Sequence, residues 1–399
     1  MKLINEKLKN NVLASMITII DKNREELLSA NKKDLDAFKK EDQALYDRLV
    51  VNNAKIDEMI NAISEVKNQE DPVSKVISSD QLDSGLKIIN KTAPFGTIMI
   101  IYESRPDVTI EAAVLAFKAN NKILLKGGKE AYHSNKVLVK FWHDALRANN
   151  LTTDWIKMLE LNREETRAFL KNPDEPLDLI VPRGGERLIQ FVKENASCAV
   201  LVSGRGNNFL YVAEDADWKK TLEVIINAKT NKISGCNALD KVLMDTKIPN
   251  YEAKLIELKE VLKASKVEVI VDSEVRKTLS SSEEIKDESI WFKEFLAMKI
   301  AIGAVDSMEE AISKINKYSG GHSSAILTES TERANNFMEN VDSAAVYHNA
   351  STRFTDGGQM GVGAELAIST DKLHHRGPLG LKQLVTNKYY VYGDGHVRV

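Results

Sequence analysis

Cys236 is the residue of this chain whose surroundings best suit a nucleophile. It stands in the run "NAKTNKISGCNALD", residues 227–240, among small and polar neighbours. A cysteine thiolate attacks activated carbonyl carbons and forms a covalent intermediate. Cysteine more often packs as a small hydrophobe, as we expect of Cys198 in "SCAVLV". Both interpretations of Cys236 stay open from the residues alone, and Lys229 and Lys232 are candidates for lowering the pKa of its thiol.

Two glycine pairs have the setting of a phosphate site. They occur in "LLKGGKEA" and "IVPRGGER", each after a strand-like run and before a helix-like one. Glycine lets the backbone approach a ligand, and the N–H groups at a helix N-terminus favour phosphate. Neither pair forms a G-x-G-x-x-G motif, so a tight strand-to-helix turn is the alternative. Lys126 and Arg183 flank the pairs, the second of which is Gly184 and Gly185, and are candidates for a nucleotide 2′-phosphate and pyrophosphate.

Two arginines are candidates for binding an anionic substrate. Arg105 lies in "YESRPDVT", where Pro106 suits the first helical position and Asp107 the first turn. Arg353 lies in the glycine- and hydroxyl-rich run "NASTRFTDGGQMGVGAEL", which begins at Asn349. An arginine suits a carboxylate or a phosphate. The alternatives are a salt bridge at a helix cap for the first and an ordinary surface loop for the second.

The elements that must position these residues form an alternating pattern. Residues 1–68 predict amphipathic helices. From residue 94, strand-like and helix-like runs alternate up to "CAVLV", and a second alternating block follows Cys236. This rhythm predicts an α/β fold with a mostly parallel, doubly wound sheet. Cys236 lies between the two blocks, a location that favours a ligand cleft.

Composition excludes several classes of function. The 399 residues carry a net charge of −3, so nothing indicates nucleic-acid binding or a polybasic membrane patch. No apolar run approaches the roughly 18 residues of a membrane helix. Two cysteines and no H-E-x-x-H spacing predict no metal site, and "LHHRG" at 373–377 is interpreted as a polar loop. We expect a cytoplasmic protein with a small-molecule substrate.

Several runs together resemble the gamma-glutamyl phosphate reductase family of the aldehyde dehydrogenase superfamily. They span residues 94–399 in one order and include "YESRPDVT", "KGGKEA", "DLIVPRGGERLI", "NAKTNKISGCNA", "NASTRFTDGG" and "GDGHVR". The resemblance implies an aldehyde-dehydrogenase-like fold. It also implies NADPH-dependent reduction of L-glutamyl 5-phosphate to glutamate 5-semialdehyde with release of phosphate, in proline biosynthesis.

The resemblance assigns roles to individual residues. Cys236 matches the family nucleophile, and Ser104 matches a superfamily asparagine that stabilises the oxyanion. The substrate-binding candidates are Arg105, Asn349 and Arg353. The cofactor-binding candidates for NADPH are Lys126, Arg183, Gly184, Gly185 and Glu294, of which Glu294 matches the glutamate that holds the nicotinamide ribose.

Two departures from related sequences bear on function. Oxidising aldehyde dehydrogenases carry a glutamate base that hydrolyses the thioester, whereas the aligned position near Val202 carries no acid. This absence favours a reductase. Many reductases of the family also carry a Cys-His pair where this chain has Asn207, Asn208, Phe209 and Leu210. That change leaves open a shifted substrate preference.

We expect three domains. The NADPH-binding domain would comprise 1–76, 94–231 and 360–384, the catalytic domain 232–359, and an oligomerisation flap 77–93 and 385–399. A homo-oligomer and an association with glutamate 5-kinase are the expected partners. The alternatives are a hydrolytic or CoA-acylating aldehyde dehydrogenase and an inactive scaffold protein.

Overall fold

The computed structural model describes residues 2–39 and 43–398. The chain forms two compact units. The first comprises Met1–Val202, Gly361–Ala367 and Leu379–Val399, and the second Ser203–Met360 and Ile368–Pro378. Residues 1, 40–42 and 399, which belong to the predicted NADPH-binding domain and flap, lie outside the described residues.

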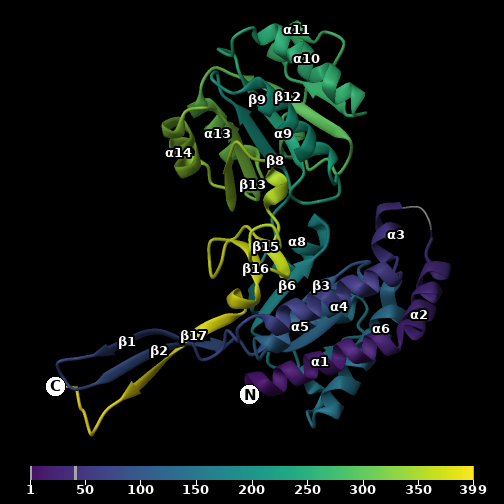
Figure 1. Ribbon diagram of the computed structural model, residues 1–399, viewed down its shortest axis with the longest axis vertical. Helices are drawn as coiled ribbons and strands as arrows, with labels where there is room; N and C mark the ends of the chain where they lie inside the picture. The colour runs from purple at the N-terminus through teal and green to yellow at the C-terminus, as the bar shows by residue number, and fades with distance from the viewer. Residues whose placement is uncertain (1, 40–42, 399) are drawn as a thin grey trace. The chain divides into compact units, whose positions relative to one another are not determined.

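The first unit begins with four helices, as the amphipathic pattern predicts. They are α1 (Glu6–Lys22), α2 (Arg24–Ala37), α3 (Gln43–Leu49) and α4 (Asn53–Asn68). The Asn5 side chain caps α1 by accepting a hydrogen bond from the Leu8 N–H, and Asn52 caps α4 in the same way. Leu13 and Met16 of α1 are fully buried, and α1 packs against α4 and α6. Figure 1 shows these helices beside the sheet of the same unit.

A five-stranded parallel sheet forms the core of the first unit, in the order β5-β4-β3-β6-β7. Its strands are β3 (Thr97–Tyr102), β4 (Lys122–Gly127), β5 (Ile156–Met158), β6 (Leu179–Arg183) and β7 (Ala199–Val200). Its helices are α5 (Pro106–Lys118), η1 (Lys129–Ala131), α6 (Tyr132–Ala148), η2 (Thr153–Trp155), α7 (Arg163–Lys171) and α8 (Glu186–Asn195). Tyr102 pairs with Gly127 on one side and with Arg183 on the other, so three central strands end at one edge.

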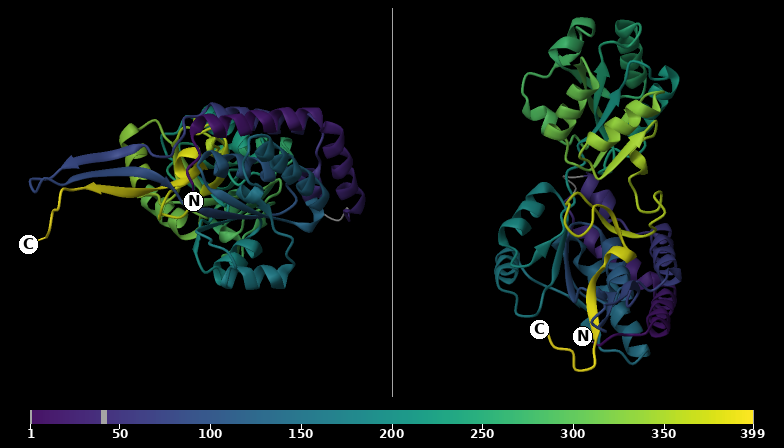
Figure 2. Two further views of the ribbon diagram at one scale, coloured as in Figure 1. Left: turned by 90° about the horizontal axis from the view of Figure 1, so that it is seen from below. Right: turned by 90° about the vertical axis from the view of Figure 1, so that its left-hand side faces the viewer.

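A three-stranded antiparallel sheet joins distant parts of the chain within the first unit. It pairs β1 (Val76–Gln81) with β2 (Lys87–Pro94), and β2 with β17 (Val385–Tyr392). Figures 1 and 2 show the three strands extending together away from the five-stranded sheet. The residues predicted to form a flap lie here. Their role in oligomerisation stays a prediction.

The second unit contains a seven-stranded parallel sheet in the order β11-β10-β12-β9-β8-β13-β14. Its strands are β8 (Asn208–Val212), β9 (Leu239–Asp245), β10 (Glu268–Val271), β11 (Glu283–Glu284), β12 (Lys299–Val305), β13 (Ser323–Leu327) and β14 (Ala345–His348). Its helices are α9 (Trp218–Thr230), α10 (Tyr251–Ala264), α11 (Ser273–Thr278), α12 (Ser289–Phe292), α13 (Met308–Tyr318), α14 (Thr331–Asn340) and η3 (Thr352–Phe354).

The compact units divide after Val202, whereas the sequence placed the end of the cofactor-binding segment at residue 231. The reason is β8, which pairs with β9 and β13 and therefore belongs to the second sheet. The remaining elements are β15 (Glu365–Ser369) and β16 (Gly377–Gly380), which pair with each other, and the short η4 (Leu381–Gln383). The parallel α/β architecture confirms the predicted fold class. Within the described residues, no helix is long and apolar enough to cross a membrane.

Candidate active site

Cys236 lies in the loop between α9 and β9 of the second unit. Cys236 is half-buried, and neither cysteine of the sequence forms a disulfide. Asn208, which is fully buried at the start of β8, anchors this loop. The Asn208 Nδ2 group donates to the carbonyl oxygen of Cys236 at 2.8 Å and to that of Ala238 at 2.7 Å. Asn208 Oδ1 accepts from the Ser323 N–H, so one amide connects the Cys236 loop to strand β13.

Asn237 connects the same loop to the arginine loop. Its Nδ2 group donates to the carbonyl oxygens of Arg353 at 3.1 Å and Thr355 at 2.9 Å. In return, Thr352 Oγ1 donates to the carbonyl oxygen of Asn237 at 2.8 Å. The cysteine loop and the arginine loop, 116 residues apart in sequence, therefore form one hydrogen-bonded assembly.

The guanidinium group of Arg353 lies against this assembly. A Cβ atom on Gly235 would come within 2.7 Å of an Arg353 Nη atom, so glycine at that position gives the guanidinium room beside Cys236. Burial lowers the pKa of Arg353, and the charge on Cys236 opposes that shift. A cation beside the thiol favours its ionised form. The structure thus brings together two residues that the sequence named separately.

Gly206 lies against both the Cys236 loop and the side chain of Glu294. A Cβ atom on Gly206 would collide with the Cys236 backbone and would approach Glu294 Oε1 to 2.6 Å. Burial, followed by the charge of Asp240, raises the pKa of Glu294, and the Gly206 N–H acts against both. Glycine at position 206 therefore lets the backbone approach the Cys236 loop and the half-buried Glu294 carboxyl group at the same time.

Two of the expected side chains are engaged elsewhere in the second unit. The Lys229 ammonium group is fully buried and donates to Asp240 Oδ1 at 2.8 Å. Asn349 has a left-handed backbone with φ of 51°, which asparagine tolerates better than most residues. Its amide donates to the Thr328 carbonyl oxygen at 2.8 Å and accepts from the Thr328 N–H. It shapes the loop that leads to Arg353.

The first unit presents its candidates at the carboxyl edge of β3, β4 and β6. Ligands of open α/β sheets bind at such edges. Ser104 is buried, and both its N–H and its Oγ donate to Glu130 Oε1, at 2.7 and 3.0 Å. Arg105 Nη2 contacts Asp107 Oδ2 at 3.1 Å, and Lys55 of α4 reaches the same carboxylate at 2.9 Å.

The two glycine pairs have different surroundings. The N–H of Gly185, at the N-terminus of α8, donates to Glu103 Oε2 at 3.4 Å, so this turn already faces a carboxylate. Gly127 and Gly128 border a hollow of about 190 Å³, which is also lined by Lys126, Lys129, Tyr132 and Glu160. Burial lowers the pKa of Lys126, and Glu130 opposes that shift. The two lysines suit the negative charge of a nucleotide.

Comparisons with known proteins now place the chain. It is 41% identical to the gamma-glutamyl phosphate reductase of Clostridium botulinum over 392 residues, which cover 98% of this chain and 94% of that one. The chain belongs to the gamma-glutamyl phosphate reductase family. The crystal structure of the reductase from Thermotoga maritima matches with a TM-score of 0.94 at 42% identity, over 99% of this chain and 95% of the other.

More distant matches agree on the fold. Residues 283–365 match the aldehyde dehydrogenase family. An acetylating aldehyde dehydrogenase from Geobacillus thermoglucosidasius matches with a TM-score of 0.69 at 17% identity, over 99% of this chain and 94% of the other. These findings confirm the resemblance seen in the sequence. As a member of the reductase family with an aldehyde-dehydrogenase-like fold, the chain is an oxidoreductase.

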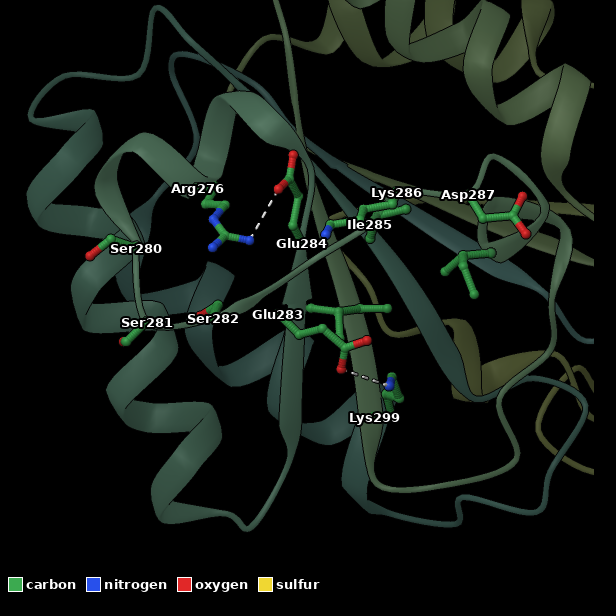
Figure 3. Close-up of a pocket in the computed structure, with 12 residues that line it drawn as sticks. Arg276, Ser280, Ser281, Ser282, Glu283, Glu284, Ile285, Lys286, Asp287 and Lys299 are labelled. Carbon is green, nitrogen blue, oxygen red and sulfur yellow. Dashed lines mark hydrogen bonds and ion pairs between the residues drawn. The ribbon is translucent and has the colours of Figure 1, made fainter.

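A larger hollow of about 640 Å³ lies elsewhere in the second unit, beside β10 and β11. Figure 3 shows Arg276 directed at Glu284 and Lys299 directed at Glu283, at 3.1 and 3.8 Å. Its lining includes none of the residues that the sequence proposed for the reductase site. Two of its cations are already neutralised by neighbouring carboxylates.

Sequence reasoning missed the residues that hold the site. The sequence singles out Asn208 only as a difference from many related reductases. It does not identify the anchoring roles of Asn237, Thr352 and Asp240. Buried polar side chains within a strand or next to the nucleophile are the signal that could have found them, because such groups need hydrogen-bond partners.

Proposed function

We propose that this chain catalyses the NADPH-dependent reduction of L-glutamyl 5-phosphate to L-glutamate 5-semialdehyde, with release of phosphate. This reaction is the second step of proline biosynthesis from glutamate. The observation that carries the proposal is the Cys236 loop, which is clamped by Asn208 and Asn237 beside the Arg353 guanidinium. The named reductases that are similar over nearly the full chain support the choice of substrate.

Cys236 is the proposed nucleophile. Its thiolate attacks the acyl phosphate carbon, a carbon–sulfur bond forms, and the bond from that carbon to the phosphate oxygen breaks. Phosphate leaves with the bonding electron pair, and a thioacyl enzyme remains. Arg353 favours the thiolate beforehand through its positive charge and is a proposed partner of the substrate anion. Arg105 and Asn349 are the other proposed substrate contacts.

The residues present fit a nicotinamide coenzyme. Glu294 has a half-buried carboxyl group that suits the hydroxyls of a ribose, and the hollow beside Lys126 and Lys129 suits a phosphorylated adenosine ribose. NADPH supplies the hydride that converts the thioester into the aldehyde. Cys236 then departs as a thiolate and the carbon–sulfur bond breaks. Arg183, Gly184 and Gly185 stay proposed coenzyme contacts, with Glu103 as the group that the coenzyme phosphates would have to displace.

The negative oxygen formed in both tetrahedral steps needs hydrogen-bond donors. The backbone N–H of Cys236 is one proposed donor. The Ser104 hydroxyl is the second, and it becomes available only when it leaves Glu130 Oε1. Val202, near the position of the hydrolytic base in oxidising relatives, carries no carboxyl group, which protects the thioester from water.

The alternative functions are less well supported. A hydrolytic aldehyde dehydrogenase needs the missing base. An inactive scaffold was favoured only by the run that includes Asn207 and Asn208. That run holds the nucleophile loop in place, because Asn208 binds the Cys236 carbonyl oxygen. The association with glutamate 5-kinase stays a prediction.

The test is the reverse reaction with glutamate 5-semialdehyde and NADP⁺, with and without phosphate. We expect phosphate-dependent NADPH formation, and we expect Cys236→Ser to lower it by roughly a thousandfold or more, as removal of a nucleophile usually does. The matched control is Cys198→Ser, which should keep full activity. Near-normal turnover by Cys236→Ser would contradict the mechanism.

Two further outcomes separate the alternatives. Activity that requires coenzyme A in place of phosphate would indicate an acylating dehydrogenase. A wild-type Cys236 that iodoacetamide does not label at neutral pH, in a protein without turnover, would indicate the scaffold.

A further inference from the structure

Asp240 and Lys241 hold the peptide backbone on both sides of Glu294. Asp240 Oδ2 accepts a hydrogen bond from the Phe295 N–H at 2.8 Å. Lys241 Nζ donates to the Lys293 carbonyl oxygen at 2.8 Å. Both side chains are buried, at 2% and 0% exposure, so water does not compete for these bonds. Two consecutive residues of β9 thus fix the residue before and the residue after Glu294.

An irregularity in the sheet explains how two consecutive residues reach one segment. Successive side chains of a strand normally point to opposite faces. In the pairing of β8 with β9, Asn208 pairs with Leu239 and Phe209 pairs with Lys241, so Asp240 is passed over. Such a bulge re-aims a side chain, and bulges are frequent next to active sites. The register shifts between Asn208 and Phe209, so the bulge lies next to the residue that anchors the Cys236 loop.

A buried network of charges stabilises this arrangement. Lys229 of α9 donates to Asp240 Oδ1 at 2.8 Å. The Lys241 ammonium group lies 3.7 Å from the centre of the Phe295 ring, within cation–π distance. Burying several charges is costly and seldom adds net stability, but it defines one geometry. The network is therefore better suited to fixing the position of a segment than to stabilising the fold.

The charge of Lys241 depends on pH near neutrality. Burial lowers the pKa of Lys241 to about 7. The groups that face it are Asp240 and Glu294, which raise the pKa, and Lys229 and Lys293, which lower it. Contact with the Phe295 ring also favours the charged form. Protonated Lys241 makes a charge-assisted hydrogen bond to the Lys293 carbonyl oxygen, whereas the neutral amine makes a weaker one.

We propose that Asp240 and Lys241 are positioning residues, which hold Glu294 where its carboxylate binds the nicotinamide ribose of the coenzyme. This inference rests on the proposed function, because it takes Glu294 as the ribose ligand. It predicts an effect on coenzyme binding that is separate from the binding of the acyl phosphate. It also predicts that coenzyme binding weakens as the pH rises through about 7.

The main variant is Lys241→Met, which keeps a long unbranched side chain and removes the ammonium group that donates to the Lys293 carbonyl oxygen. We expect the dissociation constant of NADPH to rise about tenfold, the usual effect of losing one hydrogen bond from a charged group. The KM for glutamate 5-semialdehyde should stay within about twofold, since no lost contact involves it. The control is Lys9→Met in the first unit, which removes another fully buried lysine, one that pairs with Asp71. It should lower stability and leave NADPH binding unchanged.

Binding is measured by the fluorescence of NADPH in the Cys236→Ser background, where no turnover occurs. In the otherwise wild-type chain we expect binding to weaken about fivefold from pH 6 to pH 8.5, the difference between a charge-assisted and a neutral hydrogen bond. Lys241→Met should show no such dependence across that range. In both proteins, NADPH binding should still weaken at low pH, where Glu294 becomes protonated.

Each result decides the inference. Equal NADPH affinities for Lys241→Met and its parent, or equal pH profiles, would overturn it while leaving the proposed reductase intact. If Lys241→Met does not fold, the wild-type profile decides, and a flat profile between pH 6 and 8.5 would overturn the inference. A wild-type chain without NADPH binding and without phosphate-dependent turnover would overturn the proposed function as well.

Discussion

The side-chain amide of Asn208 donates a hydrogen bond to the carbonyl oxygen of Cys236 at 2.8 Å. The same Nδ2 group also reaches the carbonyl oxygens of Ala238 and Gly206, at 2.7 and 3.1 Å. Asn208 is fully buried, so these contacts are not shared with water. Asn208 therefore anchors the backbone of Cys236, the proposed nucleophile.

Replacing Asn208 should damage both stability and catalysis. Asn208→Ala leaves buried carbonyl oxygens without their donor, which should cost about 1–3 kcal/mol of unfolding free energy. A displaced nucleophile loop should lower kcat by at least roughly tenfold, because reacting groups tolerate little misplacement. Urea unfolding and the phosphate-dependent reverse assay measure the two effects.

The control for Asn208 is a surface amide in the same unit. Asn316 Nδ2 donates to the Asn340 carbonyl oxygen at 2.9 Å in an exposed position. Asn316→Ala should change the unfolding free energy by less than about 0.5 kcal/mol and leave kcat unchanged. A kcat for Asn208→Ala equal to that of the control would show that Cys236 does not depend on this anchor.

Much of the fold could be predicted because its pattern is local. Alternating strand-like and helix-like runs predict both parallel sheets. The breaks at Gly127 and Gly184 mark turns between a strand and the following helix in the first sheet. Strand β8 was not identified as such, because Asn207 and Asn208 gave its start a polar appearance. Both are buried, and their Nδ2 groups donate to the backbone carbonyl oxygens of Trp291 and Cys236.

The contacts of the site could not be predicted in the same way. Cys236 and Arg353 were each named from their own segments, yet no local pattern shows that Gly235 makes room for the guanidinium. Lys229 was considered as a cation near the thiol, but its buried ammonium group pairs with Asp240. The Gly184–Gly185 turn was expected to face an anion, and sequence could not show that Glu103 already lies there.

Arg353 should control the ionisation of Cys236, the proposed nucleophile. Removing a cation within a few ångströms of an acidic group usually raises its pKa by about 1 unit or more. Arg353→Ala should therefore move the midpoint of Cys236 alkylation by iodoacetamide to higher pH. Arg353→Lys keeps the charge and should move it less. The measurement is the alkylation rate between pH 5 and pH 10, with Cys198→Ser as the background.

A second arginine of the same unit provides the comparison. Arg333 contacts Asp215 at 2.5 Å and Glu214 at 2.7 Å, and neither partner belongs to the Cys236 loop. Arg333→Ala should leave the alkylation midpoint unchanged. If Arg353→Ala also leaves it unchanged, Arg353 does not favour the thiolate and its role is limited to the substrate.

The Glu294 carboxylate should lower the stability of the folded chain at high pH while supporting coenzyme binding. Burial raises its pKa in the folded chain above the value in the unfolded chain. The folded state then binds the proton more tightly, so the contribution of this group to stability falls as the pH rises through the folded pKa. Glu294→Gln removes that loss. We expect the variant to be more stable than wild type at pH 8, and no more stable at pH 4.

The same variant should bind NADPH about tenfold more weakly, because a neutral amide replaces the carboxylate that we propose as the acceptor for the ribose hydroxyls. The control is Glu288, an exposed residue of the same segment, which pairs with Lys317 and Tyr318. These partners lower the pKa of Glu288, so Glu288→Gln should reduce stability at pH 8 and leave NADPH binding intact. Thermal unfolding at both pH values and NADPH fluorescence give the readouts. A Glu294→Gln protein that is less stable at pH 8, or that binds NADPH like wild type, would refute the role assigned to this carboxylate.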